Sequence, residues 1–242
     1  MIKIQKSDTI PAPINGVAAP GQDDTIDPAI YGADEVKAQL LEDQHYKCAY
    51  CECLLNGDFG DVEHFRPKKG YTTPQKTKLT RPGYYWLAYN WSNLLVACST
   101  CNRTYKKNHF ALADEAGRNI KGEDITNEEP LFINPAEEDP ADHIKFHEHI
   151  LAPRSSAGIS HDRAEYTIST LKLNDRPQLV GNRRRVWEAW TKLHRQRSIA
   201  KHMLNNGIET ALATELDNLV SSQIATMQSP DAEYASMLIH QG

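Results

Sequence analysis

The sequence predicts an α+β protein with a small zinc-stapled core in its N-terminal half and a mainly helical C-terminal region. Two Cys-x-x-Cys pairs, Cys48–Cys51 and Cys98–Cys101, are separated by 46 residues and can share one metal ion. Two short segments, 61–65 and 93–98, have the pattern of strands, and the second is almost entirely apolar. Beyond residue 160, apolar residues recur at helical spacing.

The composition divides the chain into four segments. Residues 1–33 are rich in Pro, Gly and Asp and are expected to form an extended arm. Residues 34–113 hold the four paired cysteines and both predicted strands. Residues 114–159 form an acidic, Pro-containing connector that we expect to fold over the surface. Residues 160–242 form the helical region.

Periodicity and capping signals place the individual helices. Asp162 and Glu165 form an Asp-x-x-Glu pair that resembles a capping box, at the start of a helix that ends at Leu173. Asp175 followed by Pro177 marks a second start. The predicted helices cover 34–46, 99–108, 162–173, 177 to at least 193, 208–220 and a short segment from 229.

The composition also bounds the environment of the protein. The 242 residues include 27 Lys and Arg against 32 Asp and Glu, a net charge of −5. The longest wholly apolar run, Leu94–Cys98, is far shorter than the about 20 residues of a bilayer-spanning helix, and the N-terminus lacks a signal-peptide core. We therefore expect a cytoplasmic protein with no membrane partner, in a reducing compartment where cysteines serve as ligands or free thiols.

The charge is unevenly distributed along the chain. Residues 64–113 contain nine Lys and Arg and no acid, which leaves 18 bases and 32 acids elsewhere. A second block, 182–201, has seven bases against Glu188 alone. Basic patches of this size suit a phosphate backbone, so nucleic acid, DNA foremost, is an expected partner despite the net acidity. For the second block, a solvated helix face is the equal alternative.

The paired cysteines indicate a structural zinc site. Two thiolates from each pair complete a tetrahedral Cys₄ set: Cys48, Cys51, Cys98 and Cys101. Four thiolates leave no open position for water or substrate, so this ion supports the fold and not the chemistry. Cys53 is left over, as a free thiol, a packing residue or a competing ligand.

The residues between and after the cysteine pairs resemble the zinc-bearing HNH endonucleases. An acid-His-x-x-Pro segment begins at Glu63, Asn-Leu follows at Asn93, and Cys-x-x-Cys-Asn ends at Asn102. The match spans Cys48–Lys107. It implies a ββα-metal core in which the acid-His pair ends the first strand and Asn102, in place of a histidine, lies near the start of the helix.

A finer resemblance covers most of the chain and points to the PtuB-like HNH nuclease subunits of Septu-type and retron-associated anti-phage systems. The motifs that carry it include CAYCE, VEHFRPK, YYWLAYNWSNLLVACSTCN and TISTLKLNDRPQLVGNRRRVW. That family works with an ATPase, a PtuA-like subunit. The sequence contains no Gly-x₄-Gly-Lys-Ser/Thr phosphate loop, so ATP would be bound by the other chain.

Phosphodiester hydrolysis needs a base for the attacking water and positive charge on the developing phosphorane. His64 suits the base, and Glu63 and Asn102 offer hard oxygen ligands that fit Mg²⁺ or Mn²⁺. By resemblance, Asn93 braces the loop that carries His64, and the division of metal binding between Asn93 and Asn102 stays open. The expected nucleic-acid contacts are Arg66, Lys68, Lys69, Arg103, Lys106 and Lys107.

The resulting expectation is a metal-dependent HNH endonuclease, the effector subunit of an anti-phage complex whose ATPase docks on the C-terminal helices. The alternative is a non-catalytic zinc module that binds nucleic acid or an effector protein through the same basic stretch.

Overall fold

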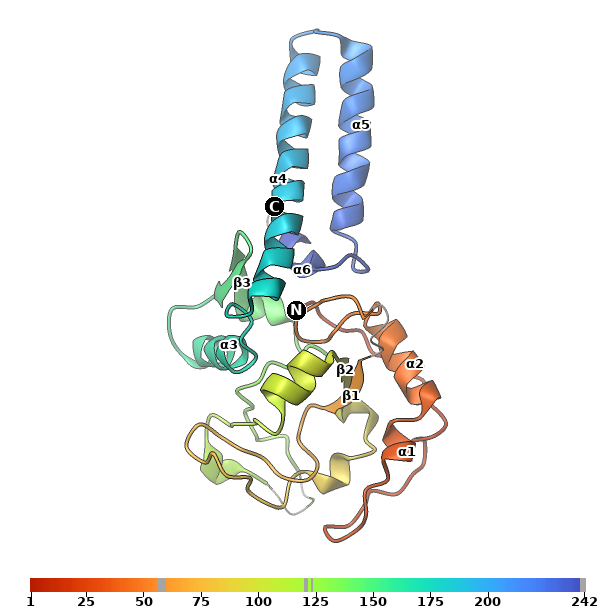
Figure 1. Cartoon of the computed structure of the whole chain (residues 1–242), viewed down its shortest axis with the longest axis vertical. Coiled ribbons are helices and arrows are strands. Elements are labelled where there is room, and N and C mark those ends of the chain that lie inside the picture. The colour runs from red at the N-terminus through yellow and green to blue at the C-terminus, as the bar shows by residue number, and fades with distance from the viewer. Residues whose placement is uncertain (56–59, 120–121, 123, 240–242) are drawn as a thin grey trace.

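The computed structural model describes residues 1–55, 60–119, 122 and 124–239. A compact body holds the N-terminal and central residues, and a long helical hairpin projects from it (Figure 1). Buried apolar side chains from all four predicted segments belong to one hydrophobic cluster, from Ile4 in the arm to Leu238 near the C-terminal end. The parts of the predicted segments that fall on residues 56–59, 120, 121, 123 and 240–242 lie outside the described residues.

Both predicted strands form and pair with each other. β1 (Asp61–His64) runs antiparallel to β2 (Leu94–Ala97), with Glu63 opposite Leu95 and His64 opposite Leu94. Every residue of β2 is buried, as its apolar sequence predicts. The helix η3 (Thr100–Lys106) follows β2 directly and has π geometry. The order strand, strand, helix agrees with the ββα arrangement expected from the sequence.

The N-terminal residues pack around this unit. The extended arm is anchored by Ile4, whose amide donates to the carbonyl of Pro135 at 2.7 Å. The short helix α1 (Pro28–Tyr31) follows, and α2 (Asp34–Asp43) packs its buried apolar side chains against β2. The segment between the strands contains two 3₁₀ turns, η1 (Tyr85–Leu87) and η2 (Trp91–Asn93).

The acidic connector is folded onto the body, as expected. Phe132 and Ile133 are fully buried. Two 3₁₀ turns, η4 (Glu115–Gly117) and η5 (Pro140–Asp142), precede an antiparallel hairpin of β3 (Ile144–His147) and β4 (Ile150–Pro153). This hairpin was not predicted from the sequence, because each strand is only four residues long and β3 includes Lys145 and His147.

The C-terminal region is helical. Its helices are α3 (Ile159–Thr170), α4 (Pro177–Asn205), α5 (Thr210–Met227) and α6 (Ala235–Ile239). α4 and α5 form the projecting hairpin, and α6 returns to the base of α4 (Figure 1). Pro177 occupies the first turn of α4, as predicted.

The predicted capping box at Asp162 is wrong. α3 begins three residues earlier, after Gly158, so Asp162 lies inside the helix. The residue before the helix is Gly158, whose φ of 84° is a backbone conformation that glycine adopts readily, and no side chain caps this end of the helix.

Within the described residues, no helix is both long and apolar enough to cross a membrane.

Candidate metal centre and catalytic cleft

The four paired cysteines converge from distant parts of the chain. The sulfur atoms of Cys48, Cys51, Cys98 and Cys101 all lie within 4.8 Å of one another. In a tetrahedral site with zinc–sulfur bonds of about 2.3 Å, the sulfurs are about 3.8 Å apart. The Cys51 and Cys98 sulfurs are 3.8 Å apart, so the cluster fits a zinc ion. The first pair lies in the turn after α2, and the second at the junction of β2 and η3, so the ion would join the helix to the sheet.

Hydrogen bonds to sulfur surround this cluster. The amide of Cys98 donates to the Cys48 sulfur at 3.3 Å, and the amide of Cys101 donates to the Cys98 sulfur at 3.4 Å. Arg176, directly before α4, donates from Nη1 to the Cys101 sulfur at 3.3 Å. Burial opposes the charge of Arg176, but the nearby thiolates of Cys101 and Cys51 outweigh it and raise the pKa of the guanidinium. Hydrogen bonds of this kind orient the cysteine side chains and offset the negative charge of the thiolates.

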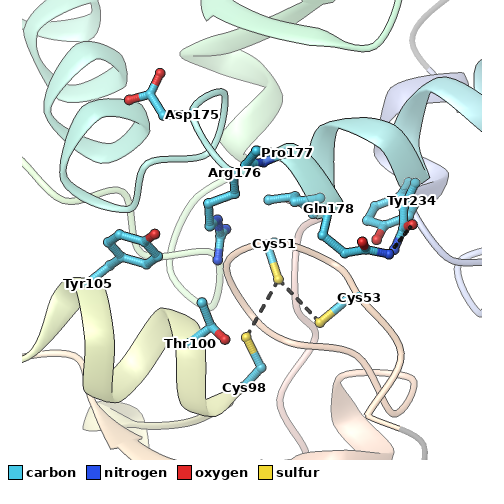
Figure 2. A pocket seen from close by; sticks show the side chains of 12 residues that line it. Cys51, Cys53, Cys98, Thr100, Tyr105, Asp175, Arg176, Pro177, Gln178 and Tyr234 are labelled. Atoms are coloured by element: carbon cyan, nitrogen blue, oxygen red, sulfur yellow. Dashed lines mark hydrogen bonds between the residues drawn. The ribbon is translucent and has the colours of Figure 1, made fainter.

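Cys53 lies at the edge of the cluster. Its sulfur is 3.3 Å from the Cys51 sulfur, but it is outside the set of four that share one centre. Figure 2 shows Cys53, Cys51 and Cys98 beside Arg176, all lining a cavity of about 370 Å³ at the base of α4. Cys53 therefore lies close to the four paired cysteines, as expected from the sequence, but it is not one of the four that share a centre.

The end of β1 and the start of η3 border a second cavity of about 330 Å³, which we call the candidate cleft. Glu63, His64 and Asn102 all line it, although Glu63 and His64 are neighbours on a strand. The π geometry widens η3 at this point, since the amide of Lys107 donates to the carbonyl of Asn102 at 2.7 Å. The sequence-predicted acid, histidine and asparagine are therefore brought to one cavity.

The surroundings of His64 determine which ring nitrogen is a base. Nε2 lies 3.0 Å from the carbonyl oxygen of Ala88, which can only accept, so Nε2 carries the proton. Nδ1 keeps its lone pair and faces the ammonium of Lys68 at 3.0 Å. Burial and the adjacent Lys68 lower the pKa of His64 to about 3, so the ring is neutral at pH 7. The ring therefore presents the lone pair of Nδ1 to Lys68 and the candidate cleft, and displacement of Lys68 would make this nitrogen more basic.

Glu63 is buried beside a cation. Its carboxylate forms an ion pair with the fully buried ammonium of Lys106 at 2.5 Å, and Lys106 also donates to the carbonyl of His64 at 3.1 Å. Burial raises the pKa of Glu63 above its ordinary value, and Lys106 opposes that rise. Lys106 therefore binds the strand end that carries both acid and histidine.

Asn93 does not line the candidate cleft but fixes the chain beneath it. Its side-chain oxygen accepts from the Arg66 amide at 2.8 Å, and its amide donates to the carbonyls of Arg66 and Leu87 at 3.1 and 3.2 Å. These bonds tie the segment after His64 to the 3₁₀ turn η1. The side chain is buried, and both its oxygen and its amide group are used in these hydrogen bonds.

The six predicted phosphate contacts fall into two groups. Four line the candidate cleft: Lys68, Lys69, Arg103 and Lys107. Arg66 and Lys106 are buried and do not line it. Arg66 forms an ion pair with Glu128 and lies 5.2 Å from the ring centres of Tyr84 and Phe110. Among the four that line the cleft, Arg103 donates from Nε to the Asp61 carboxylate at 2.6 Å. The three lysines are therefore the main cations facing the cavity.

Sequence reasoning missed two residues of these sites. Tyr31, from α1, packs its ring edge-on against His64 with centroids 4.6 Å apart and closes one side of the candidate cleft. Arg176 reaches the cysteine cluster from the other end of the chain. Tyr31 lies in no motif, and the motif that contains Arg176 does not indicate a contact with the cysteines, because each residue is brought to its site only by the packing of distant segments.

The fold and site thus define a class: a small ββα unit with four cysteines placed to hold one metal ion and an adjacent acid–histidine cleft. No protein-family model matches the chain. The chain is 43% identical over 117 residues to "Septu protein PtuB" of Bacillus mycoides (strain KBAB4), which is 48% of this chain and 40% of that protein. It is 31% identical over 154 residues to "Septu protein PtuB" of Bacillus thuringiensis, which is 63% of this chain and 46% of that one. The chain spans less than half the length of these curated relatives.

Proposed function

We propose that the chain is a metal-dependent HNH endonuclease that hydrolyses nucleic-acid phosphodiesters, DNA foremost, as the effector of a Septu-type or retron-associated anti-phage complex with a PtuA-like ATPase subunit. The observation that supports the chemistry best is His64, neutral and held by the Ala88 carbonyl with Nδ1 toward a cavity lined by lysines. The likeness to proteins named Septu protein PtuB supports the anti-phage role.

In this proposal His64 is the general base. The Nε2–H bond to Ala88 fixes the ring plane, and Nδ1 takes a proton from the water that attacks phosphorus. Lys68, now 3.0 Å from Nδ1, would move to the incoming phosphate and leave the lone pair to the water. Lys69 and Lys107 add positive charge at the cavity rim, where the phosphorane develops charge.

The donor set of the candidate cleft fits a hard divalent cation. Glu63 and Asn102 present carboxylate and amide oxygens to one cavity, the ligand types that Mg²⁺ and Mn²⁺ prefer. Burial raises the pKa of Glu63, and the ion pair with Lys106 opposes that rise and so supports the ionised form that a cation requires. Such a cation would stabilise the leaving oxygen. The cysteine cluster would hold zinc and supply no reacting group.

The projecting hairpin is the proposed docking site for the ATPase subunit. On α5, Leu212, Leu216 and Leu219 recur at helical spacing, and Leu212 and Leu219 are 59% and 57% exposed. Exposed apolar stripes of this kind mark protein interfaces. Because the sequence contains no Gly-x₄-Gly-Lys-Ser/Thr phosphate loop, ATP would be bound by the partner subunit.

The test is a cleavage assay with the zinc-loaded chain on DNA and RNA, with Mg²⁺ or Mn²⁺, alone and with the ATPase subunit. We expect cleavage that needs the divalent ion and that His64→Ala abolishes. Equal cleavage by His64→Ala would reject the catalytic assignment. Absence of cleavage in every arm would favour the non-catalytic zinc module.

A further inference from the structure

The candidate cleft offers few free cations for a long polyanion. Of the six basic residues expected to contact phosphate, Arg66 and Lys106 are buried in ion pairs and Arg103 is paired with Asp61. Contacts between Lys or Arg and phosphate supply essentially all non-specific affinity for nucleic acid. Basic surface elsewhere on the chain would therefore add to the affinity that Lys68, Lys69 and Lys107 supply in the cleft.

The helix α4 presents such a surface. Five of its bases are exposed, and four of these lie on one face: Arg184, Arg185, Lys192 and Arg195. At about 100° per residue, these four positions fall within about 100° of one another, along about 16 Å of helix. We call them the basic stripe. The other three bases of the helix point elsewhere. Arg183 is buried, Arg197 faces α5, where its Nε lies 3.4 Å from Asp217, and Lys201 lies on the opposite side of the helix from Lys192.

The basic stripe differs from an ordinary solvated helix face. Solvated helices interleave acids and bases that pair three or four residues apart, but Glu188 is the only acid between residues 182 and 201. Within the described part of the chain, no carboxylate lies at ion-pair distance from the four bases. Arg184 donates to the ring of His149 at 3.3 Å, and Arg185 donates to the side chain of Asn182.

The neighbouring helix shows that the charge is specific to one face. α5 contains Glu215 and Asp217 and no Lys or Arg, so the hairpin is basic only along α4. The exposed leucines that we assign to the ATPase subunit lie on α5. The two helices of the hairpin (Figure 1) therefore carry surfaces of different chemistry, one apolar and one cationic.

We propose that the basic stripe of α4 binds the phosphate backbone of duplex nucleic acid and supplies affinity that the candidate cleft lacks. This inference rests on the proposed function, because it deepens how the nuclease would hold its substrate. The binding is independent of base sequence, since the stripe presents only guanidinium and ammonium groups to the phosphates. An acidic surface on a protein partner is the competing occupant, which the experiment below separates.

The test compares Lys192→Gln with Lys201→Gln in the full chain. Lys201 is exposed on the same helix but nine residues on, about 180° around, so it is a matched control. Binding to a fluorescein-labelled DNA duplex is followed by anisotropy without Mg²⁺ or Mn²⁺, between about 50 and 200 mM KCl. We expect Lys192→Gln to reduce the slope of log affinity against log salt by about 0.9, and Lys192→Gln/Arg195→Gln by about 1.8.

At about 0.1 M salt, each removed contact weakens binding about eightfold, whereas Lys201→Gln binds as the wild type does. Glu188→Gln, which removes the one acid of this face, tightens binding. Equal slopes for Lys192→Gln and Lys201→Gln, or no binding of the duplex by the wild type, would overturn the proposal. So would unchanged DNA affinity together with loss of the co-purifying ATPase subunit, because the stripe would then be a protein interface.

Failure of the stripe and failure of the nuclease assignment give different results. If His64→Ala abolishes cleavage while the stripe variants bind DNA like the wild type, the stripe proposal is wrong and the nuclease stands. If the stripe variants lose DNA affinity and no metal or partner produces cleavage, the stripe stands and the nuclease assignment is wrong. Thermal unfolding of each variant checks that substitution of these exposed residues leaves the fold intact.

Discussion

Substitution of Asn93 by Ala tests whether this residue braces the loop that carries His64. Asn93 is buried and makes three hydrogen bonds, one accepted from the Arg66 amide and two donated to the carbonyls of Arg66 and Leu87. Alanine would leave three buried main-chain groups without these partners. At about 1 kcal/mol for each, we expect the free energy of unfolding to fall by about 3 kcal/mol.

Asn90 supplies the control, because it is the same residue type three positions earlier. Its side chain is exposed and caps η2 by accepting from the Ser92 amide at 2.9 Å. Asn90→Ala should cost about 1 kcal/mol, the usual value of a capping residue. Asn93→Asp should not rescue the brace, since a carboxylate accepts from the Arg66 amide but cannot donate to the two carbonyls.

The assay is urea unfolding of the zinc-loaded proteins, followed by circular dichroism, with the midpoint and slope fitted for each variant. We expect the order wild type, Asn90→Ala, Asn93→Ala, with Asn93→Asp no more stable than Asn93→Ala. A loss for Asn93→Ala no larger than that for Asn90→Ala would refute the bracing role and the energetic reasoning with it.

Three further predictions concern zinc and pH. Elemental analysis should find one zinc per chain, and Cys101→Ser should lower both zinc content and melting temperature; a wild-type chain free of bound zinc would contradict the assignment. Arg176→Gln should weaken zinc binding about tenfold in competition with a chromophoric chelator, because the charged hydrogen bond to Cys101 is lost; unchanged affinity would exclude this role. Burial disfavours the ionised form of Glu138, but hydrogen bonding to Arg163 outweighs it and lowers the pKa of the carboxyl below its ordinary value of 4.5. The pair therefore stabilises the fold above pH 4.5, and this stabilisation is lost as the pH falls below 4.5. In Glu138→Gln, the free energy of unfolding should depend less on pH in this acidic range. An unchanged dependence on pH would show that the pair contributes nothing.

Local patterns predicted the elements whose residues carry their own signal. The apolar run of β2 signalled a buried strand, and the Cys-x-x-Cys spacing signalled the cysteine cluster. Pro177 marked the start of α4. The convergence of Glu63 and Asn102 on one cavity followed from the order of motifs in the chain, together with the resemblance to HNH enzymes.

Other features depend on contacts between segments that no local pattern encodes. Lys106 and Arg66 have the same local charge signal as Lys69, but their burial depends on Glu63 and Glu128, which only the folded chain brings beside them. The tautomer of His64 depends on a backbone carbonyl, which the sequence does not distinguish from any other. The sequence therefore predicted that this region is basic, and packing determined which of its cations line the candidate cleft.

The central claim, that His64 is the general base of a nuclease, is tested most directly by comparing single-turnover DNA cleavage by His64→Ala and His109→Ala. His109 lies outside the candidate cleft, and its Nδ1 is 3.1 Å from the Thr72 hydroxyl, so it controls for loss of an imidazole. We expect a loss of about 10²- to 10⁴-fold for His64→Ala and a rate near that of the wild type for His109→Ala. Equal rates for the two variants would contradict the claim.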